Sequence, residues 1–339
     1  MENAQDTYPG FGKEAPIQGI QPGSGWGMRL ELAWGRFRHR VLWTFYPAYV
    51  AEQAKQRQGL CENCPGRGLG CTRNIIDSRD LKYFKNVCGY SFAAENDRYA
   101  WRGELPFARW GLAELIAFSL VCLVASSIVG WLAWWGTPTW LVWLLSIAIG
   151  LFWLEIIWFF RNPFRAITTD PAAIVSPADG TIVELAEVDA EGFPGNRAFR
   201  VGIFLSVFNV HINRAPLAGV VTQLRFYPGR FLNALKTLSA RVNEQLWIDM
   251  KHDETGMPVR ITQISGALAH RIVCELKPGQ HVNKGEMFGM IKLGSRTELY
   301  LPTDAKIELN VKVGDQVKGG STILMRLVQT VTPSAVSHG

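Results

Sequence analysis

The chain has 339 residues, a formal net charge of +6, and 48% hydrophobic residues that include 13 tryptophans. This length allows one substantial globular domain with accessory segments. Apolar residues are concentrated between Leu112 and Phe160, and no nucleic-acid-binding motif is present. Since Arg102, Arg109 and Arg161 lie beside the apolar stretch, the positive charge favours an anionic membrane surface over nucleic acid as the partner.

The N-terminal part of the chain divides into two segments. Residues 1–24 are polar and rich in Gly and Pro, which predicts disorder, and they lack the apolar core of a secretory signal. Residues 25–110 form a basic, aromatic segment with four closely spaced cysteines: Cys61, Cys64, Cys71 and Cys88. Such spacing suits a tetrahedral zinc site or an iron–sulfur cluster. Two disulfides and free thiols are the alternatives, and a cytoplasmic location disfavours the disulfides.

Residues 111–160 are predicted to form a transmembrane helical hairpin. The two spans, Leu115–Trp135 and Trp140–Phe160, each have about 20 residues, enough to cross ~30 Å of hydrocarbon. The turn between them has the sequence Gly-Thr-Pro-Thr, with Thr137 as the expected N-cap of the second helix. Arginines flank the outer ends, which places both ends of the chain in the cytoplasm. A buried core hairpin and a re-entrant hairpin are the alternatives that length and tryptophan placement disfavour.

Residues 161–339 are predicted to form a β-rich domain, so that the whole chain is α+β. Short apolar runs with a period of two indicate strands at Gly180–Val188, Arg200–Leu205, Arg271–Leu276, Glu298–Leu301 and Lys306–Val311. Phe231–Trp247 is the one stretch typical of a helix. Two G-x-x-V-x-x-G turns, starting at Gly279 and Gly314, each precede a β run and suggest paired hammerhead or lipoyl-like β units.

A Gly294-Ser295 pair between two β runs offers a hydroxyl beside a carbonyl that has no neighbouring side chain. Glycine can adopt backbone angles that bend the peptide toward attack by the Ser295 hydroxyl. Such a serine needs a base, and the base needs an orienting group, for which His211 and Asp179 are the candidates. The alternatives are an ordinary Asp-Gly turn, a structural histidine and a Gly-Ser loop, since each motif alone is common.

Five fragments, in their order and spacing, resemble the phosphatidylserine decarboxylase family, specifically its shorter bacterial and archaeal-type branch. They are Pro177-Ala178-Asp179-Gly180, Phe204-Leu205-Ser206 with His211–Pro216, Tyr227–Phe231, Asn243-Glu244, and Phe288-Gly289 with Gly294-Ser295-Arg296. The similarity covers about half of the chain, from Asn162 to Leu327. The apolar hairpin ending in Phe159-Phe160-Arg161-Asn162-Pro163 is also similar to the membrane anchor of that branch.

The resemblance implies that the chain cleaves itself between Gly294 and Ser295. His211 would take the Ser295 proton, Asp179 would hold the imidazole, and Ser295 would become a pyruvoyl group at the start of residues 295–339. These would stay associated with residues 1–294 as a heterodimer, and a higher homo-oligomer is compatible with the sequence. The pyruvoyl group would form a Schiff base with phosphatidylserine and release phosphatidylethanolamine without pyridoxal phosphate or metal.

The resemblance also assigns further residues and a location. Tyr227, Phe231 and Glu244 are expected to bind substrate, and His211 is the expected proton donor during decarboxylation. Longer members carry a second histidine where this chain has Arg214, so either His211 serves both stages or another group helps. The expected location is the bacterial inner membrane, with the catalytic domain in the cytoplasm. An archaetidylserine-type decarboxylase, a non-enzymatic membrane-tethered scaffold and a carrier module are the rival interpretations.

Overall fold

The structure is a computed structural model that describes residues 100–328, apart from 228, 236–237, 268–270, 277–278 and 293, together with residues 44, 45, 47 and 48. The predicted disordered segment 1–24 and the four N-terminal cysteines lie outside the described residues. The predicted disorder of residues 1–24 and the predicted metal site therefore stay predictions. Most of residues 25–110 also lies outside the described residues, so the structure assigns no function to this segment.

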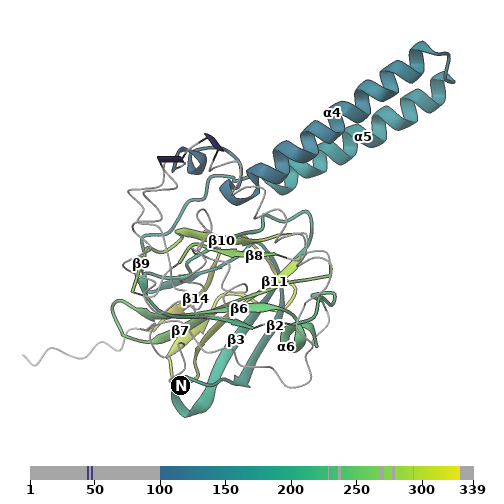
Figure 1. Ribbon diagram of the computed structural model, residues 1–339. Helices are drawn as coiled ribbons and strands as arrows, with labels where there is room; N and C mark the ends of the chain where they lie inside the picture. The colour runs from purple at the N-terminus through teal and green to yellow at the C-terminus, as the bar shows by residue number, and fades with distance from the viewer. Residues whose placement is uncertain are drawn as a thin grey trace, which may run out of the picture.

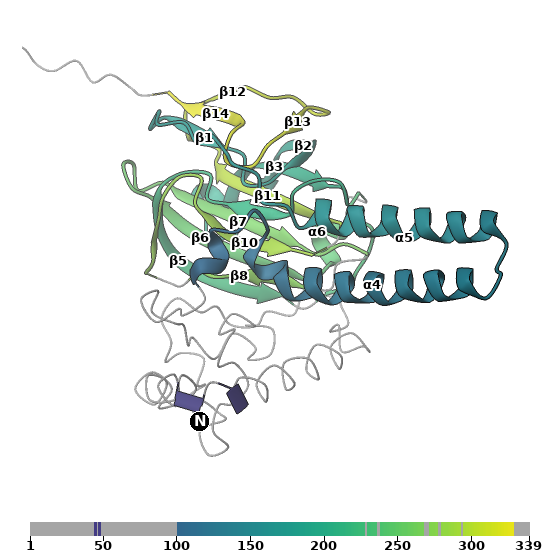
Figure 2. The same cartoon turned by 90° about the horizontal axis from the view of Figure 1, so that it is seen from above.

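Two long antiparallel helices, α4 (Leu112–Trp134) and α5 (Thr139–Phe159), project together from the β-rich domain (Figures 1 and 2). Both are long and apolar enough to cross a membrane, and few of their residues are buried. A core hairpin of a soluble protein would instead be covered by other elements. The helices contact each other through Phe118 and Phe152, whose ring centroids are 6.2 Å apart. The Trp153 indole also donates a hydrogen bond to Ser119 Oγ at 2.9 Å.

The turn between the helices is set by Gly136, which has a φ of +84° just after the end of α4. Glycine ends helices in this way because it lacks the Cβ that makes a left-handed conformation costly. The prediction that Thr137 caps α5 was wrong by one residue. The residue before the helix is Pro138, and the Thr137 hydroxyl donates to the Leu132 carbonyl at 2.8 Å. The Thr137 hydroxyl thus pairs with a backbone carbonyl near the end of α4 and does not cap the first turn of α5.

The β-rich domain contains three antiparallel sheets in the described part of the chain. The largest has eight strands, in the order β13 (Gln316–Val317), β2 (Gly180–Asp189), β3 (Arg197–Leu205), β11 (Ser295–Pro302), β7 (Pro258–Ile264), β6 (Gln245–His252), β5 (Gly219–Tyr227) and β9 (His281–Val282). A second sheet is formed by β1 (Ala173–Val175), β14 (Ile323–Leu327) and β12 (Ile307–Leu309). The third is formed by β4 (Ile212–Arg214), β10 (Met287–Ile291) and β8 (Ile272–Cys274). Strands form at all five predicted runs.

Strand β11 lies in the interior of the large sheet, between β3 and β7. Its first residue, Ser295, pairs with Leu205 at the end of β3, and Arg296 pairs with Ile264 at the end of β7. Apolar side chains of this sheet and of β14 form the main core, among them Ile203, Ile261 and Leu299. The start of β11 is thereby fixed by hydrogen bonds on both edges, which positions the site described below.

The predicted helix Phe231–Trp247 was wrong. Among the residues of this stretch that the structure describes, only Ser239–Val242 is helical (α6), and β6 already begins at Gln245. The Asn243 side chain accepts a hydrogen bond from the Leu232 N–H at 2.9 Å and donates to the Ser265 carbonyl at 2.7 Å. Side-chain bonds of this kind compete with helix formation, and the pairing of β6 with β5 and β7 overrides local helix propensity.

Candidate active site

The Gly294–Ser295 peptide bond lies where the chain passes from β10 of the small sheet to β11 of the large one. Gly294 has a φ of +66°, a left-handed conformation that strongly favours glycine. Ser295 is fully buried, and its Oγ has no hydrogen-bond partner among the described residues. A buried hydroxyl without a partner costs free energy, so its retention calls for a functional explanation.

The carbonyl of Gly294 packs against the backbone of Gly266. A Cβ placed on Gly266 would lie only 1.9 Å from the Gly294 oxygen. The segment before Gly266 is fixed, because the N–H and the hydroxyl of Ser265 both donate to the Glu244 carbonyl, at 2.9 and 3.0 Å. The buried residue Glu244 therefore supports the wall behind the Gly294 carbonyl. The sequence carried no motif that marks Gly266.

His211 brings a base to this bond. Its Nε2 accepts a hydrogen bond from the Gly294 N–H at 3.1 Å, and its Nδ1 lies 2.9 Å from the Asn209 carbonyl. Since a carbonyl only accepts, Nδ1 carries the proton and Nε2 keeps its lone pair. Burial lowers the pKa of His211 to about 4, because it outweighs the raising effect of the hydrogen bond with the Asn209 carbonyl, and the charge of Arg161 adds a smaller lowering. The imidazole is therefore neutral at neutral pH.

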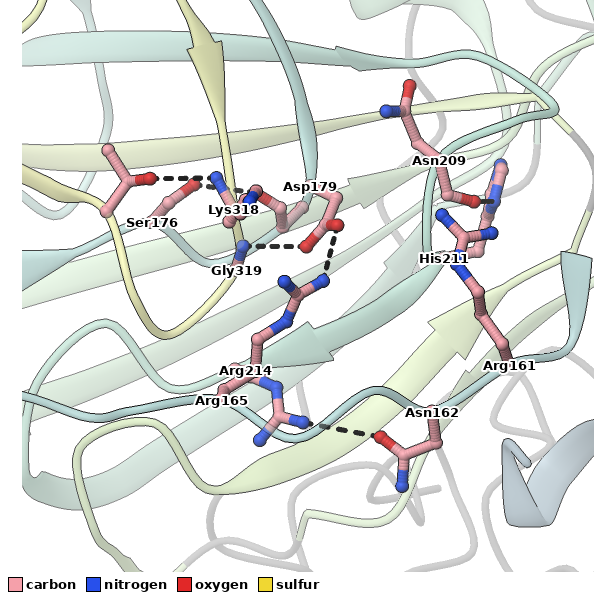
Figure 3. Close-up of polar contacts among 12 residues, drawn as sticks. Arg161, Asn162, Arg165, Ser176, Asp179, Asn209, His211, Arg214, Lys318 and Gly319 are labelled. Carbon is pink, nitrogen blue, oxygen red and sulfur yellow. Dashed lines mark hydrogen bonds and ion pairs between the residues drawn. The ribbon is translucent and has the colours of Figure 1, made fainter. Parts of the chain in front are cut away.

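Asp179 is close to the site but does not orient His211 as expected from the sequence. Its carboxylate accepts hydrogen bonds from Arg165 at 2.6 Å and from the Gly319 N–H at 2.7 Å (Figure 3). Burial raises the pKa of Asp179 against the opposing effect of Arg165. The imidazole is held by Asn209 because the Asn209 side chain accepts from Ser206 and closes the turn before His211. A catalytic role for Asp179 stays a prediction.

The end of α5 packs directly on the His211 loop. The ring of Phe159 stacks against the imidazole, and both Trp158 Nε1 and the Arg161 guanidinium donate to the Phe208 carbonyl, at 3.2 and 3.0 Å. Apolar contacts extend this junction from both helix bases to β4 and β10. They involve Ala108, Leu115, Ile156, Phe159, Phe160, Val210, Ile212 and Met290. The helical hairpin and the histidine thus belong to one packed unit, which the sequence did not reveal.

A second contact joins the hairpin to the other side of the site. Lys292, two residues before Gly294, forms an ion pair with Glu114 in the first turn of α4. The lysine side chain is 11% exposed and the glutamate 29%. The short segment that contains the Gly294 carbonyl is therefore held by an α4 side chain, just as His211 is covered by α5.

The remaining predicted substrate residues are placed differently from one another. Tyr227 is buried, stacks on Trp247 at 4.5 Å and accepts a hydrogen bond from Arg225 at 3.1 Å. Phe231 is half-buried in the segment after the Arg230 bridge to Asn243. Glu244 is linked to the site through Ser265. A role in substrate binding stays a prediction for all three.

Metal binding is predicted only for cysteines outside the described residues. Within the described part of the chain, no cluster of three or more His, Cys, Asp or Glu side chains could hold a metal ion. Cys122 and Cys274 are described, and both are buried and free. The zinc prediction therefore has no structural support and stays a prediction.

Comparison with known proteins finds relatives over most of the chain. The family model described as "Phosphatidylserine decarboxylase" matches residues 154–325. The "Phosphatidylserine decarboxylase proenzyme" of Rhodopirellula baltica is 46% identical over 250 residues, covering 74% of this chain and 100% of the relative. The protein of the same name from Carboxydothermus hydrogenoformans is 37% identical, covering 66% and 97% of the two chains. No solved structure matches the chain.

Proposed function

Because the chain belongs to the phosphatidylserine decarboxylase family, we propose that it cleaves itself between Gly294 and Ser295 and then decarboxylates phosphatidylserine to phosphatidylethanolamine. Its relatives are named proenzymes, which fits activation by cleavage. One observation carries the assignment of residues: the unprotonated Nε2 of His211 faces the peptide that contains Gly294, beside a buried serine hydroxyl without a partner.

In the cleavage step, Ser295 Oγ attacks the Gly294 carbonyl carbon while His211 Nε2 takes the hydroxyl proton. The imidazole must first exchange its hydrogen bond from the Gly294 N–H for one from Ser295 Oγ. The carbon–nitrogen bond of the peptide then breaks, the proton held by the imidazole passes to the leaving nitrogen, and the Gly294 acyl group forms an ester with Oγ. Elimination removes the Cα proton of residue 295 and breaks the Cβ–Oγ bond, which leaves Gly294 as a carboxylate and residue 295 as an enamine. The enamine tautomerises to an imine, and water hydrolyses the imine to the ketone with release of ammonia.

The product is a pyruvoyl group at residue 295, and the residues present fit it. The position is fully buried, has no side-chain hydrogen bond to be lost, and lies beside a neutral imidazole. When formed, the group supplies a carbonyl that accepts the substrate amine and withdraws electrons as CO2 leaves. His211 is the residue positioned to deliver a proton at this point, because its Nε2 lies 3.1 Å from the nitrogen of Gly294, the residue before 295.

The two products, residues 1–294 and 295–339, are expected to remain together as a heterodimer. The shorter product would begin with β11, which is hydrogen-bonded to β3 and β7, and would also contain β12, β13 and β14. Strand β14 pairs with β1 and β13 pairs with β2, both from the longer product. Separation would break all of these ladders, so cleavage need not release the fragment.

The proposal places the enzyme in the bacterial inner membrane. Its two apolar helices support insertion, and basic residues at their outer ends favour a catalytic domain in the cytoplasm.

The two G-x-x-V-x-x-G turns both pack on Ile167, through Gly285 and Gly320, which supports paired hammerhead-like units. The combination of Ser295, Gly294 and His211 is that of an enzyme and disfavours a non-enzymatic scaffold.

Denaturing electrophoresis and mass spectrometry of the purified protein test this function. Wild-type protein should give a C-terminal fragment whose mass corresponds to a pyruvoyl start at residue 295. Ser295→Ala should remain full length and inactive, while Ser321→Ala, in a turn of the same domain, should be cleaved normally. Decarboxylation of phosphatidylserine by an uncleaved Ser295→Ala protein would contradict the proposal.

A further inference from the structure

Three arginines, Arg161, Arg165 and Arg214, lie in the region between Asp179 and His211 (Figure 3), close enough to influence one another's pKa. Arg165 is paired with Asp179. Arg161 donates to the carbonyls of Trp158 and Phe208, at 2.6 and 3.0 Å. Arg214 donates to the Gly285 carbonyl at 3.0 Å and to Asn162 Oδ1 at 3.4 Å. Of these three arginines, only Arg165 forms an ion pair with a carboxylate of the described part of the chain.

The cluster carries more positive than negative charge. Burial is the largest cause that lowers the pKa of both Arg161 and Arg214. The charge of Arg165 lowers both further; the opposing effect of Asp179 is larger than that of Arg165 at Arg161 and smaller at Arg214. Glu155, on α5, is the other carboxylate that acts on Arg161. Three guanidinium groups thus face two carboxylates, and one positive charge is left in a partly desolvated place. An anion bound there would relieve the repulsion between the arginines.

The position of the cluster indicates which anion would reach it. Arg161 is two residues beyond the end of α5, at the level where a helix that spans a bilayer meets the lipid headgroups. Arg161 contacts two residues with exposed aromatic side chains, Trp158 and Phe208, which are 53% and 63% exposed, and Phe164, just before Arg165 in the chain, is 94% exposed. Charged groups framed by exposed aromatic rings suit a ligand with a phosphate and adjoining acyl chains.

The cluster also lies next to the reacting residues. The Arg161 charge contributes to the lowered pKa of His211, and His211 Nε2 is 3.1 Å from the Gly294 nitrogen. In phosphatidylserine the phosphate is separated from the amine by two carbon atoms. We expect a phosphate held at Arg161 to leave the amine on the side of His211 and residue 295.

We propose that Arg161, Arg165 and Arg214 form the site that binds the phosphodiester group of the lipid substrate. The inference rests on the proposed function and deepens it, since it assigns a subsite to the same reaction. Guanidinium groups bind phosphate oxygens through paired hydrogen bonds, which lysine cannot reproduce. The arginines bind and orient the substrate, whereas His211 and residue 295 take part in the making and breaking of covalent bonds.

Kinetics of the cleaved enzyme in mixed micelles test the site. Arg214→Gln and Arg161→Gln should raise KM for phosphatidylserine about tenfold or more, with a smaller effect on kcat. Arg197→Gln serves as the matched control, because Arg197 is exposed and pairs with Glu187 on the β2–β3 hairpin. Loss of cleavage in the wild-type protein would refute the proposed function, whereas normal cleavage with unchanged KM in both variants would refute only the phosphate site.

Two soluble inhibitors distinguish phosphate from carboxylate. Glycerophosphocholine carries a phosphodiester and no free amine, and N-acetylserine carries a carboxylate and a blocked amine. Arg214→Gln should weaken inhibition by glycerophosphocholine about tenfold and leave that by N-acetylserine unchanged. The reverse pattern, or no inhibition of the wild-type enzyme by glycerophosphocholine, would overturn the proposal.

A variant that fails to cleave can still be tested. Ser295→Ala and Ser295→Ala/Arg214→Gln are compared as uncleaved proteins for glycerophosphocholine binding by saturation-transfer NMR. The double variant should lose the signal, and equal signals would contradict the site. Circular dichroism on both proteins separates this result from misfolding.

Discussion

The centroid of the Phe159 ring lies 4.5 Å from that of the His211 imidazole, with 37° between the ring planes. Phe159 is the last residue of α5, so a residue of the proposed membrane anchor covers the proposed base. This contact contributes to the burial that lowers the pKa of His211 to about 4. The anchor is therefore expected to influence chemistry as well as location.

Phe159→Ala should make self-cleavage sensitive to mild acid. In the wild-type protein His211 stays neutral, and competent as a base, until the pH falls toward its pKa of about 4. Removing the ring admits water and moves that pKa back toward the ordinary value, so the variant should slow as the pH falls from 7.5 to 5.5 while the wild type does not. Pulse–chase in cell-free translation with membranes measures the rate.

Phe152→Ala is the control for this change, because Phe152 lies on the same helix and contacts Phe118 instead of the site. Its pH profile should match that of the wild-type protein. Identical pH profiles for Phe159→Ala and the wild type would show that the ring does not control the protonation of His211.

Gly266→Ala should slow self-cleavage by a factor of ten or more. The added Cβ would overlap the Gly294 oxygen, so the carbonyl must turn away from its position beside Ser295 Oγ. A misplacement of about 1 Å in a reacting group can lower a rate about 100-fold. Gly103→Ala is the control, since nothing lies within 4 Å of a Cβ there. Cleavage of Gly266→Ala at the control rate would mean that the carbonyl position is unimportant.

The ion pair between Lys292 and Glu114 should help to hold the segment before Gly294. Glu114→Gln is expected to slow cleavage several-fold, because the segment loses its link to α4. The exchanged pair Glu114→Lys/Lys292→Glu should recover part of the rate if the pairing itself matters. A double-mutant cycle on cleavage rates should give a coupling of about 0.5–3 kcal/mol. Additive effects of the two single changes would contradict the link.

The sequence predicted those parts of the fold whose signals are local. The apolar runs of α4 and α5 are long and are separated at Gly136, and the strands follow a period of two, so both were found to within a few residues. Phe231–Trp247 was misassigned because its pattern is helical, whereas its structure is fixed by hydrogen bonds from Asn243 to distant backbone groups. Tertiary contacts of that kind leave no periodic signal.

In the candidate site, too, residues within local motifs were predicted and tertiary contacts were not. Ser295, Gly294 and His211 were predicted from motifs, and the structure brings Gly294 and His211 into hydrogen-bond contact. The partner of His211 was missed because it is a backbone carbonyl, which any residue at position 209 would supply. Contacts made by Phe159 and Gly266 depend on how separate elements pack, and nothing in their sequence neighbourhoods marks them.

The buried charges at the start of β11 should stabilise the cleaved protein. Glu298 is fully buried, accepts from Arg296 Nε at 2.7 Å and from the Tyr300 hydroxyl at 2.5 Å, while Arg296 also pairs with Glu184 on β2. Glu298→Gln would leave the buried positive charge of Arg296 with one carboxylate partner fewer. Removing one partner of a buried ion pair typically lowers the free energy of unfolding by about 3–5 kcal/mol. Glu298 also pairs at 3.9 Å with Arg200 of β3, which belongs to the longer product, so the loss should weaken the association of the two products.

Chemical denaturation of the cleaved enzyme in detergent, followed by size-exclusion chromatography, measures this effect. Glu298→Gln should release the C-terminal fragment at a lower denaturant concentration than the wild-type protein. Glu308→Gln is the matched control, because Glu308 lies on β12 at an exposed position. Release of the fragment at the same concentration in all three proteins would mean that the strand ladders around β11 hold the heterodimer without help from the buried charges.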